Sequence, residues 1–228
     1  MKSPRSDRSV WETGIDHEVR YWRDYLATEG FHGAEDFLFR FDPDAPLQPH
    51  LADRLPQGLP ACELRILDCA AGPATVVGKT LEGTRVPITA VDALAEQYRC
   101  VLQDLHLTPP VPSIPCDVEQ LHTKFGSDQF SLVYMRFALD HCYDPVGALR
   151  QMVRVARPSC VVMVEHYRDE HETEYQGLKS WTLVPEPNDL AICNTLHRLS
   201  VQEELPGIPI ELDSSPSWLT LILHKPSE

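Results

Sequence analysis

Basic residues are scarce in this sequence: 20 lysines and arginines stand against 34 acidic residues, which gives the 228-residue chain a net charge of −14. A surface of that sign repels a phosphate backbone, so we expect no nucleic-acid partner. No run of 18 apolar residues occurs, so we expect no transmembrane helix and no membrane partner. The first residues also lack the apolar core of a signal peptide, which favours a cytoplasmic protein.

Closely spaced cysteine pairs are also missing. The seven cysteines are scattered, and no two have the C-x-x-C spacing, so the sequence indicates neither a zinc site nor a disulfide framework. Glycine is sparse as well, with 11 residues against 20 prolines, which is typical of stiff loops. The length suits one globular domain with a sizeable core.

From residue 61 onward, apolar runs of strand length alternate with helical patterns. We expect strands at 65–69, 88–92, 113–116, 130–135 and 161–165, and helices at 75–81, 95–105 and 145–156. This order predicts an α/β fold with a Rossmann-like, doubly wound parallel sheet. Residues 208–212 and 218–224 flank a turn cluster, so the last strand should be antiparallel. Between the expected strands at 161–165 and 208–212, we expect a small hairpin formed by 181–184 and 190–194, followed by a helix within 196–205.

Residues 1–60 are predicted to form a helical N-terminal extension, and residues 61–228 the Rossmann-like domain. The pattern at 10–28 favours one helix with an unusually aromatic face, made of Trp11, Tyr21, Trp22 and Tyr25. A short helix is expected at 34–40. The aromatic face either packs on the domain or forms a lid over a substrate pocket, and the sequence leaves both open.

The loop after the first expected strand is the most informative stretch. The strand ends at Asp68, small residues follow to Gly72, and Asp92 ends the next strand twenty residues later. Dinucleotide binding requires the pattern G-x-G-x-x-G, but here alanine and threonine replace the outer glycines. Pro73 also removes one backbone N–H that an anion would use. These residues favour a nucleoside ligand without a pyrophosphate and disfavour a nicotinamide-dependent oxidoreductase, which remains an alternative.

Four motifs in this order carry a resemblance to a known family. They read ILDCAAGPATVVG, ITAVDAL, SIPCDVEQL and FSLVYMRFALDHCYDPVGALRQMVRVARPSCVVMVEH, and lie between residues 62 and 166. The stretch resembles the class I S-adenosylmethionine-dependent methyltransferases, in the small-molecule (methyltransferase type 11-like) branch. Alanine 70 departs from the usual glycine of the first motif.

The resemblance implies S-adenosylmethionine as cofactor and a set of residues that bind it. Asp68 would lie near the methionine amino group, and Asp92 would accept the ribose hydroxyls. Asp117 would take the adenine amine beside Val118, and Arg136 would line the wall near the reacting methyl group. The full implied cofactor set is Asp68, Ala70, Gly72, Asp92, Ala93, Asp117, Val118 and Arg136.

Two histidines are the candidates for catalysis. His141 and His166 follow the expected strands at 130–135 and 161–165, and a neutral imidazole can take a proton from a hydroxyl or amine. The alternative roles are a hydrogen bond that holds the loop for His141 and a solvated polar face for His166 and Glu165. Histidine, aspartate and glutamate can all bind metals, and Asp140 and Glu165 lie next to these two histidines in the sequence. No spacing specifies a metal site, however, so we predict no metal.

The sequence as a whole predicts a methyltransferase that transfers a methyl group to an oxygen or nitrogen of a small molecule. A methyltransferase-like module without catalytic activity is the non-enzymatic alternative. The sequence leaves the oligomeric state open, with a homodimer as one alternative.

Overall fold

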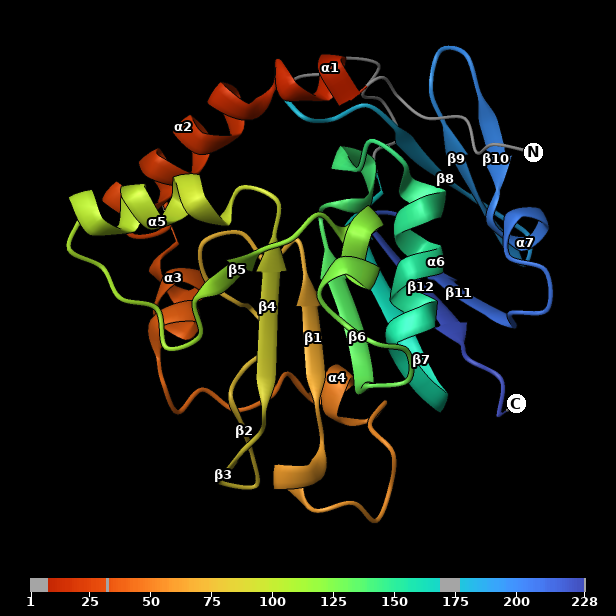
Figure 1. The fold of residues 1–228 in the computed structure, drawn as a ribbon, viewed down its shortest axis with the longest axis horizontal. Coiled ribbons are helices and arrows are strands. Elements are labelled where there is room, and N and C mark those ends of the chain that lie inside the picture. The colour runs from red at the N-terminus through yellow and green to blue at the C-terminus, as the bar shows by residue number, and fades with distance from the viewer. Residues whose placement is uncertain (1–7, 32, 169–176, 228) are drawn as a thin grey trace.

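The computed structural model describes residues 8–31, 33–168 and 177–227, and its centre is a seven-stranded sheet. The order across the sheet is β11-β12-β7-β6-β1-β4-β5 (Figure 1). The strand bounds are β1 Ile66–Cys69, β4 Ile88–Asp92, β5 Ser113–Pro115, β6 Phe130–Arg136, β7 Ala156–Tyr167, β11 Ile210–Ser214 and β12 Trp218–His224. The expected α/β class and strand order along the chain are confirmed.

Strand direction follows the connections. β1 pairs in parallel with both β4 and β6. The crossovers from β4 to β7 carry helices, whereas the crossover from β1 to β4 carries the strands β2 (Thr80–Leu81) and β3 (Thr84–Arg85). β12 pairs antiparallel with both β7 and β11, which confirms the expected direction of the last strand. β7 begins at Ala156, earlier than the expected residue 161, because its first residue already pairs with Phe130 before an irregular step in the register.

Two helices in the crossovers match their expected positions. α5 spans Ala95–Asp104 and α6 spans Pro145–Val155. Asp144 caps α6 by accepting the backbone N–H of Gly147, and Pro145 occupies the first turn, where its missing N–H is harmless. Two short 3-10 helices, η2 Val118–Thr123 and η3 Leu139–His141, lie in the crossovers as well, and a third, η1 Ala61–Glu63, precedes β1.

The expected helix at 75–81 is wrong. The backbone there turns away from helix at Gly78, whose φ is +96°, and the N–H of Lys79 bonds to the carbonyl of Ala45. The segment ends in β2 Thr80–Leu81, which pairs with β3 Thr84–Arg85. Backbone groups that bond to a distant segment are not free for the i to i−4 ladder, so tertiary pairing displaces the helix.

The N-terminal helices are α1 Arg8–Glu12, α2 Ile15–Ala27, α3 Ala34–Phe41 and α4 Pro49–Ala52. Of these, α1 and α2 lie over the edge of the sheet where β1 and β4 end, whereas α4 lies near the opposite end of β1 (Figure 1). The single helix expected at 10–28 is broken at Gly14, where an added Cβ would come within 2.1 Å of the carbonyl oxygen of Gly177. The short helix expected at 34–40 is confirmed, while the domain boundary near residue 60 stays a prediction.

A second, three-stranded sheet follows β7 in the chain. It consists of β8 Thr182–Glu186, β9 Asp189–Cys193 and β10 Arg198–Ser200, in the order β10-β9-β8. The expected hairpin is therefore confirmed, but the expected helix at 196–205 is only the short α7, Val201–Glu204, because β10 takes the preceding residues to extend the sheet.

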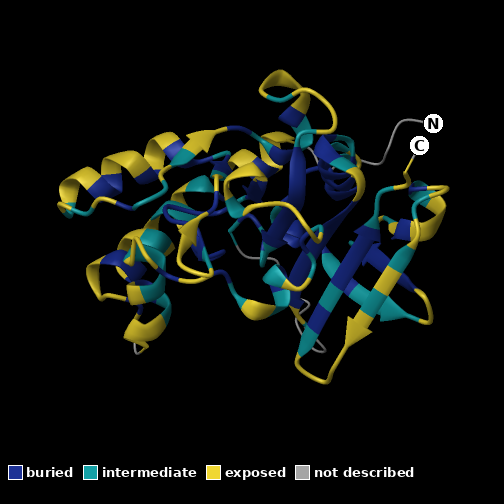
Figure 2. Ribbon diagram, turned by 90° about the horizontal axis from the view of Figure 1, so that it is seen from below, coloured by how far each residue is buried: buried dark blue, intermediate teal, exposed yellow. Residues whose placement is uncertain are grey.

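The main core lies on both faces of the seven-stranded sheet. Figure 2 shows the central strands mostly in the buried colour, with exposed residues on the outer faces of the helices. β1 is buried at all four positions, as expected for a parallel strand covered on two sides. No helix within the described ranges is long and apolar enough to cross a membrane.

Candidate cofactor and acceptor site

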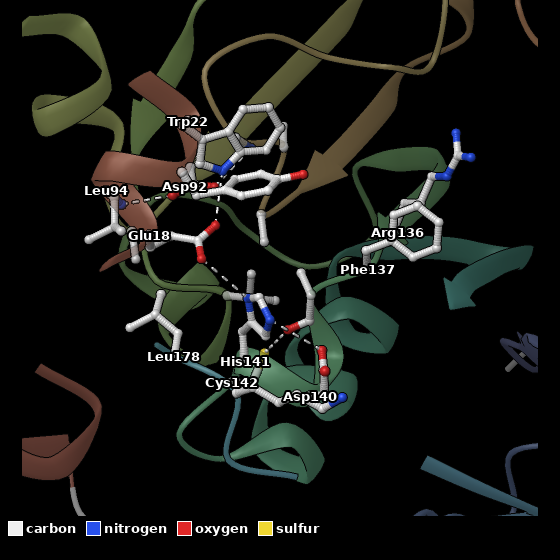
Figure 3. Close-up of a pocket in the computed structure, with 18 of the residues that line it drawn as sticks. Glu18, Trp22, Asp92, Leu94, Arg136, Phe137, Asp140, His141, Cys142 and Leu178 are labelled. Atoms are coloured by element: carbon white, nitrogen blue, oxygen red, sulfur yellow. Dashed lines mark hydrogen bonds and ion pairs between the residues drawn. The ribbon is translucent and has the colours of Figure 1, made fainter. Parts of the chain in front are cut away.

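A cavity of about 620 Å³ opens at the carboxyl ends of β1, β4, β6 and β7, beneath α2 (Figure 3). Ligands of open α/β sheets bind at this edge, and the volume is in the range of small-molecule sites. Of the ten residues that we predicted from sequence for cofactor binding and catalysis, nine line the cavity: Asp68, Ala70, Gly72, Asp92, Ala93, Val118, Arg136, His141 and His166.

The loop after β1 has the backbone of a glycine-rich loop. Ala70 has a φ of +53° and Gly72 a φ of +66°, both in the left-handed region. Asp68, at the base of the loop, accepts a 2.6 Å hydrogen bond from the hydroxyl of Thr75. Burial raises the pKa of Asp68 to about 6, although this hydrogen bond opposes the shift.

Asp92 closes the same loop from the neighbouring strand. Its Oδ2 accepts the N–H of Gly72 at 2.9 Å, and its Oδ1 accepts the N–H of Leu94 at 2.8 Å. Burial raises the pKa of Asp92 to about 6 against these two hydrogen bonds. The side chain lies at the cavity wall with both oxygens fixed, which is the placement that a ribose-binding carboxylate needs.

Asp117 is the one predicted cofactor residue that does not line the cavity. Its Oδ2 forms an ion pair with Arg8 at 3.0 Å and accepts the hydroxyl of Tyr143 at 3.1 Å, so α1 is fastened to this carboxylate. Val118 does line the cavity, as does the neighbouring Glu119, whose pKa burial raises to about 7. The adenine contact of Asp117 stays a prediction.

The aromatic helix α2 both packs on the domain and covers the cavity. The indole N–H of Trp22 donates to Oε1 of Glu18 at 2.9 Å, and the ring lies against Gly72. The other carboxylate oxygen of Glu18 faces Nδ1 of His141 at 4.0 Å (Figure 3). The two interpretations of the aromatic stripe are thus compatible, because one helix face makes both contacts.

His141 lies between two carboxylates. Its Nε2 is 3.8 Å from Oδ1 of Asp140, and its Nδ1 faces Glu18. Neither distance is a hydrogen bond, so the ring is placed near both carboxylates without being bound tightly by either. The indole N–H of Trp11 donates to the His141 carbonyl at 2.8 Å, which holds the backbone while the imidazole faces the cavity.

His166 is held more firmly. Its Nδ1 is 2.7 Å from the carbonyl oxygen of Tyr167, and its Nε2 is 2.9 Å from Oδ1 of Asp140. Burial alone would raise the pKa of Asp140, but His141 and His166 hold it below its usual value. The imidazole of His166 is thus held in place on both sides, whereas that of His141 has no contact short enough for a hydrogen bond to the two nearby carboxylates.

Glu165 points away from the cavity. Its Oε2 accepts the hydroxyl of Tyr134 at 2.5 Å, and its Oε1 pairs with Nε2 of His50 at 3.1 Å. Successive residues of a strand face opposite sides, so Glu165 and His166 cannot share the site. Among the described residues, no group of three or more potential ligands has the geometry of a metal site.

Residues 67–164 match the family model of the methyltransferase domain. Fewer than half of the chain's residues lie in this match, which identifies a methyltransferase-like stretch within the chain. The match agrees with the expected methyltransferase family and its cofactor, S-adenosylmethionine, and gives no support to the nicotinamide alternative. The match covers the loop after β1, both strand-end carboxylates and His141.

One curated relative is named malonyl-[acyl-carrier protein] O-methyltransferase, from Halorhodospira halophila. It is 30% identical over 155 residues, which are 60% of this chain and 48% of that protein. The chain thus matches about half the length of this relative.

Two solved structures share the fold over almost the whole chain. The [4+2]-cyclase SpnF has a TM-score of 0.56 at 13% identity, covering 99% of this chain and 98% of its own. The 1,6-didemethyltoxoflavin-N1-methyltransferase of Burkholderia thailandensis has a TM-score of 0.51 at 16% identity, with 99% and 93% covered. At these identities the similarity establishes the fold alone.

Two of the charged lining residues were not predicted from the sequence. Glu18 comes from α2, and Arg40 comes from α3, where it pairs with Asp36 at 2.7 Å. The spacing of Glu18 and Trp22, four residues apart on one helix face, was a usable signal, since such pairs meet. Nothing local in the sequence indicates that this face lies over Gly72.

Proposed function

We propose that this protein transfers a methyl group from S-adenosylmethionine to an oxygen or nitrogen of a small molecule. The observation that carries the proposal is the arrangement of Asp92 and Gly72: a strand-end carboxylate closes a left-handed, side-chain-poor loop at the wall of a 620 Å³ cavity. The curated relative is named an O-methyltransferase, which favours oxygen as the acceptor atom.

The cavity divides into a cofactor end and an acceptor end. At the cofactor end, Asp92 would accept the ribose hydroxyls and Asp68 would lie near the methionine amino group. Trp22 covers this end against Gly72 and excludes water. At the acceptor end lie His141, His166 and Arg136, from η3, β7 and β6.

The bound cofactor supplies an electrophilic methyl group on a sulfonium. In the transfer, a carbon–oxygen or carbon–nitrogen bond forms while the carbon–sulfur bond breaks, and the sulfur keeps the bonding pair. The protein mainly aligns the acceptor and excludes water. His141 takes the proton of an acceptor hydroxyl, and Glu18 and Asp140 beside it stabilise the imidazolium that forms.

The test is calorimetric titration of S-adenosylhomocysteine into wild type, Asp92→Ala and Asp53→Ala. Asp53 is exposed and lies outside the cavity, so it is the matched control. We expect Asp92→Ala to lose at least about tenfold in affinity, or 1.4 kcal/mol, and the control to bind like wild type. Equal affinity in all three proteins would overturn the assignment of the cofactor end.

Turnover is tested separately, with a panel of small hydroxyl and amine compounds and radiolabelled S-adenosylmethionine. Methyl incorporation into members of the panel supports the enzyme. Tight cofactor binding with no incorporation favours the alternative of a binding module without catalytic activity.

A further inference from the structure

Arg136 is the charged residue of the acceptor end that the fold leaves without an anionic partner. It ends β6 and lines the cavity, yet no described residue forms an ion pair or hydrogen bond with its side chain. Its Nε is buried and unsatisfied. A buried, unpaired donor on a cation is costly, so this arrangement calls for an anion from outside the chain.

The carboxylates near Arg136 have other partners. Oδ2 of Asp36 takes the hydroxyl of Tyr25 at 2.5 Å and Nε of Arg40 at 2.7 Å. Glu165 is bonded to Tyr134 and His50, and Asp140 lies against His166. The charge of Arg136 reaches Asp36 and Glu165 and helps to lower the pKa of both, but contact is made with neither.

Two aromatic rings lie beside the guanidinium of Arg136. Its central carbon lies 4.8 Å from the ring centre of Phe137 and 5.2 Å from that of Trp218. Phe137 is itself stacked on Tyr167, with centres 4.3 Å apart and planes 11° apart. The planes of Phe137 and Trp218 are 79° apart, so the guanidinium can lie parallel to only one of them, and its planar fork of N–H groups is the donor set that pairs with a carboxylate.

We propose that Arg136 binds a carboxylate of the acceptor, and that this carboxylate is a recognition group while a separate hydroxyl or amine receives the methyl. The acceptor class is thus a small hydroxy or amino acid with an apolar body that lies on Phe137 and Tyr167. This inference rests on the proposed methyl transfer and specifies its acceptor.

The bound carboxylate is a poor nucleophile in this position. Both of its oxygens would donate lone pairs to the guanidinium, which lowers their reactivity toward an electrophile. Arg136 also points away from His141, which lies beside Glu18 and Asp140 on the other side of the cavity (Figure 3). The group that loses a proton to His141 is therefore at a different point of the acceptor.

The experiment measures the affinity of matched acids and primary amides for the protein saturated with S-adenosylhomocysteine. The probes are 4-hydroxyphenylacetate, 3-hydroxybenzoate, 2-aminobenzoate and a 3-hydroxyalkanoate, each with its amide. We expect at least one acid to bind about tenfold more tightly than its amide. Arg136→Met should abolish the difference and Arg136→Lys should keep part of it, because an ammonium keeps the charge without the planar fork.

The matched control is Arg99→Met, which removes an exposed arginine that does not line the cavity and should leave the preference intact. Mass spectrometry of the product of the preferred acid should find the methyl on the hydroxyl or amine. Equal binding of every acid and amide by wild type overturns the inference, as does a methyl ester product.

Two readouts separate this inference from the proposed function. If S-adenosylhomocysteine fails to bind wild type, the proposed function fails. If it binds wild type but Arg136→Met loses it, with an unchanged melting curve, Arg136 belongs to the cofactor end and only the acceptor inference is overturned.

Discussion

The indole ring of Trp22 lies directly over Gly72, so closely that a Cβ built on this glycine would come within 2.7 Å of the ring. The contact joins the N-terminal helix α2 to the loop after β1. Helix α2 and the loop are therefore in direct contact at this point. Two features require a glycine at position 72: the close approach of the Trp22 ring and a φ of +66°.

Gly72→Ala is therefore expected to weaken cofactor binding and to lower the free energy of unfolding by about 1–3 kcal/mol. Calorimetry with S-adenosylhomocysteine and urea denaturation measure the two effects. Gly83→Ala is the matched control, because Gly83 has a φ of +76° but no atom within 4 Å of an added Cβ. It should lose stability with unchanged affinity.

The combination of Gly72→Ala with Trp22→Ala separates the contact from the backbone strain. If the contact matters, the double variant should bind better than Gly72→Ala alone. Affinity equal to wild type in the single variant would contradict the close approach of Trp22 that the structure describes.

Ala70 is the opposite case, an alanine in a conformation that suits glycine, with a φ of +53°. Ala70→Gly should remove left-handed strain and raise the free energy of unfolding by roughly 0.5–1 kcal/mol, after the greater flexibility of glycine in the unfolded chain is allowed for. Urea denaturation measures it. A loss of stability would show that the Cβ of Ala70 contributes packing that outweighs the strain.

The strand-end carboxylates were predictable because their signals are local. Asp68 and Asp92 each end a short apolar run, and parallel pairing then brings them to one edge of the sheet. The left-handed φ at Gly72 likewise follows from residue type. These parts of the fold and of the site depend on short-range patterns and on general rules of α/β topology.

The parts that were not predicted depend on distant pairing. The segment 75–81 was expected to be a helix, but its β-branched residues and Gly78 are weak helix formers, and Lys79 bonds to Ala45 instead. The aromatic stripe of α2 shows that the helix buries one face, but not that Glu18 reaches His141 or that Arg8 pairs with Asp117. An amphipathic pattern specifies a buried face without specifying its neighbour.

The affinity for S-adenosylhomocysteine should fall in acid. The pKa values of Asp68 and Asp92 are raised to about 6 by burial, and only the ionised forms accept hydrogen bonds from the ligand at full strength. Below about pH 6 protons compete with the ligand, so Kd should rise about tenfold per pH unit for each coupled group. Titrations between pH 5 and 8 measure it, and Asp92→Asn should flatten the profile.

The same carboxylates affect the ligand-free protein in the opposite sense. Because their folded pKa values exceed the unfolded ones, the folded state binds more protons between about pH 4 and 6, and their contribution to stability falls as pH rises through that window. A profile of Kd that is flat down to pH 5 in wild type would show that neither carboxylate contacts the ligand.

The ionised side chain of the buried Glu165 should stabilise the fold at neutral pH and lose this effect in acid. Burial opposes its ionisation, but His50 and Tyr134 hold its pKa below the usual value, so its contribution is present above about pH 4.5 and lost as pH falls through the folded pKa. Glu165→Gln should lower the free energy of unfolding by about 1–3 kcal/mol at pH 7, with a smaller difference at pH 4. Glu211→Gln, an exposed acid paired with Arg54, is the control and should change little.

His141 gives the sharpest test of the chemistry. His141→Gln keeps a polar side chain in η3 but removes the base, so kcat for a hydroxyl acceptor should fall about 10²–10⁴-fold while the affinity for S-adenosylhomocysteine stays the same. An amine acceptor should lose far less, because an amine needs no base before it attacks.

Glu18→Gln retains the hydrogen bond to Trp22 and removes the charge beside His141, so kcat should fall by less than in His141→Gln, with KM unchanged. Asp16→Asn on the exposed side of the same helix is the control and should behave as wild type. Equal losses for hydroxyl and amine acceptors in His141→Gln would show that the imidazole holds the loop and does not take the proton.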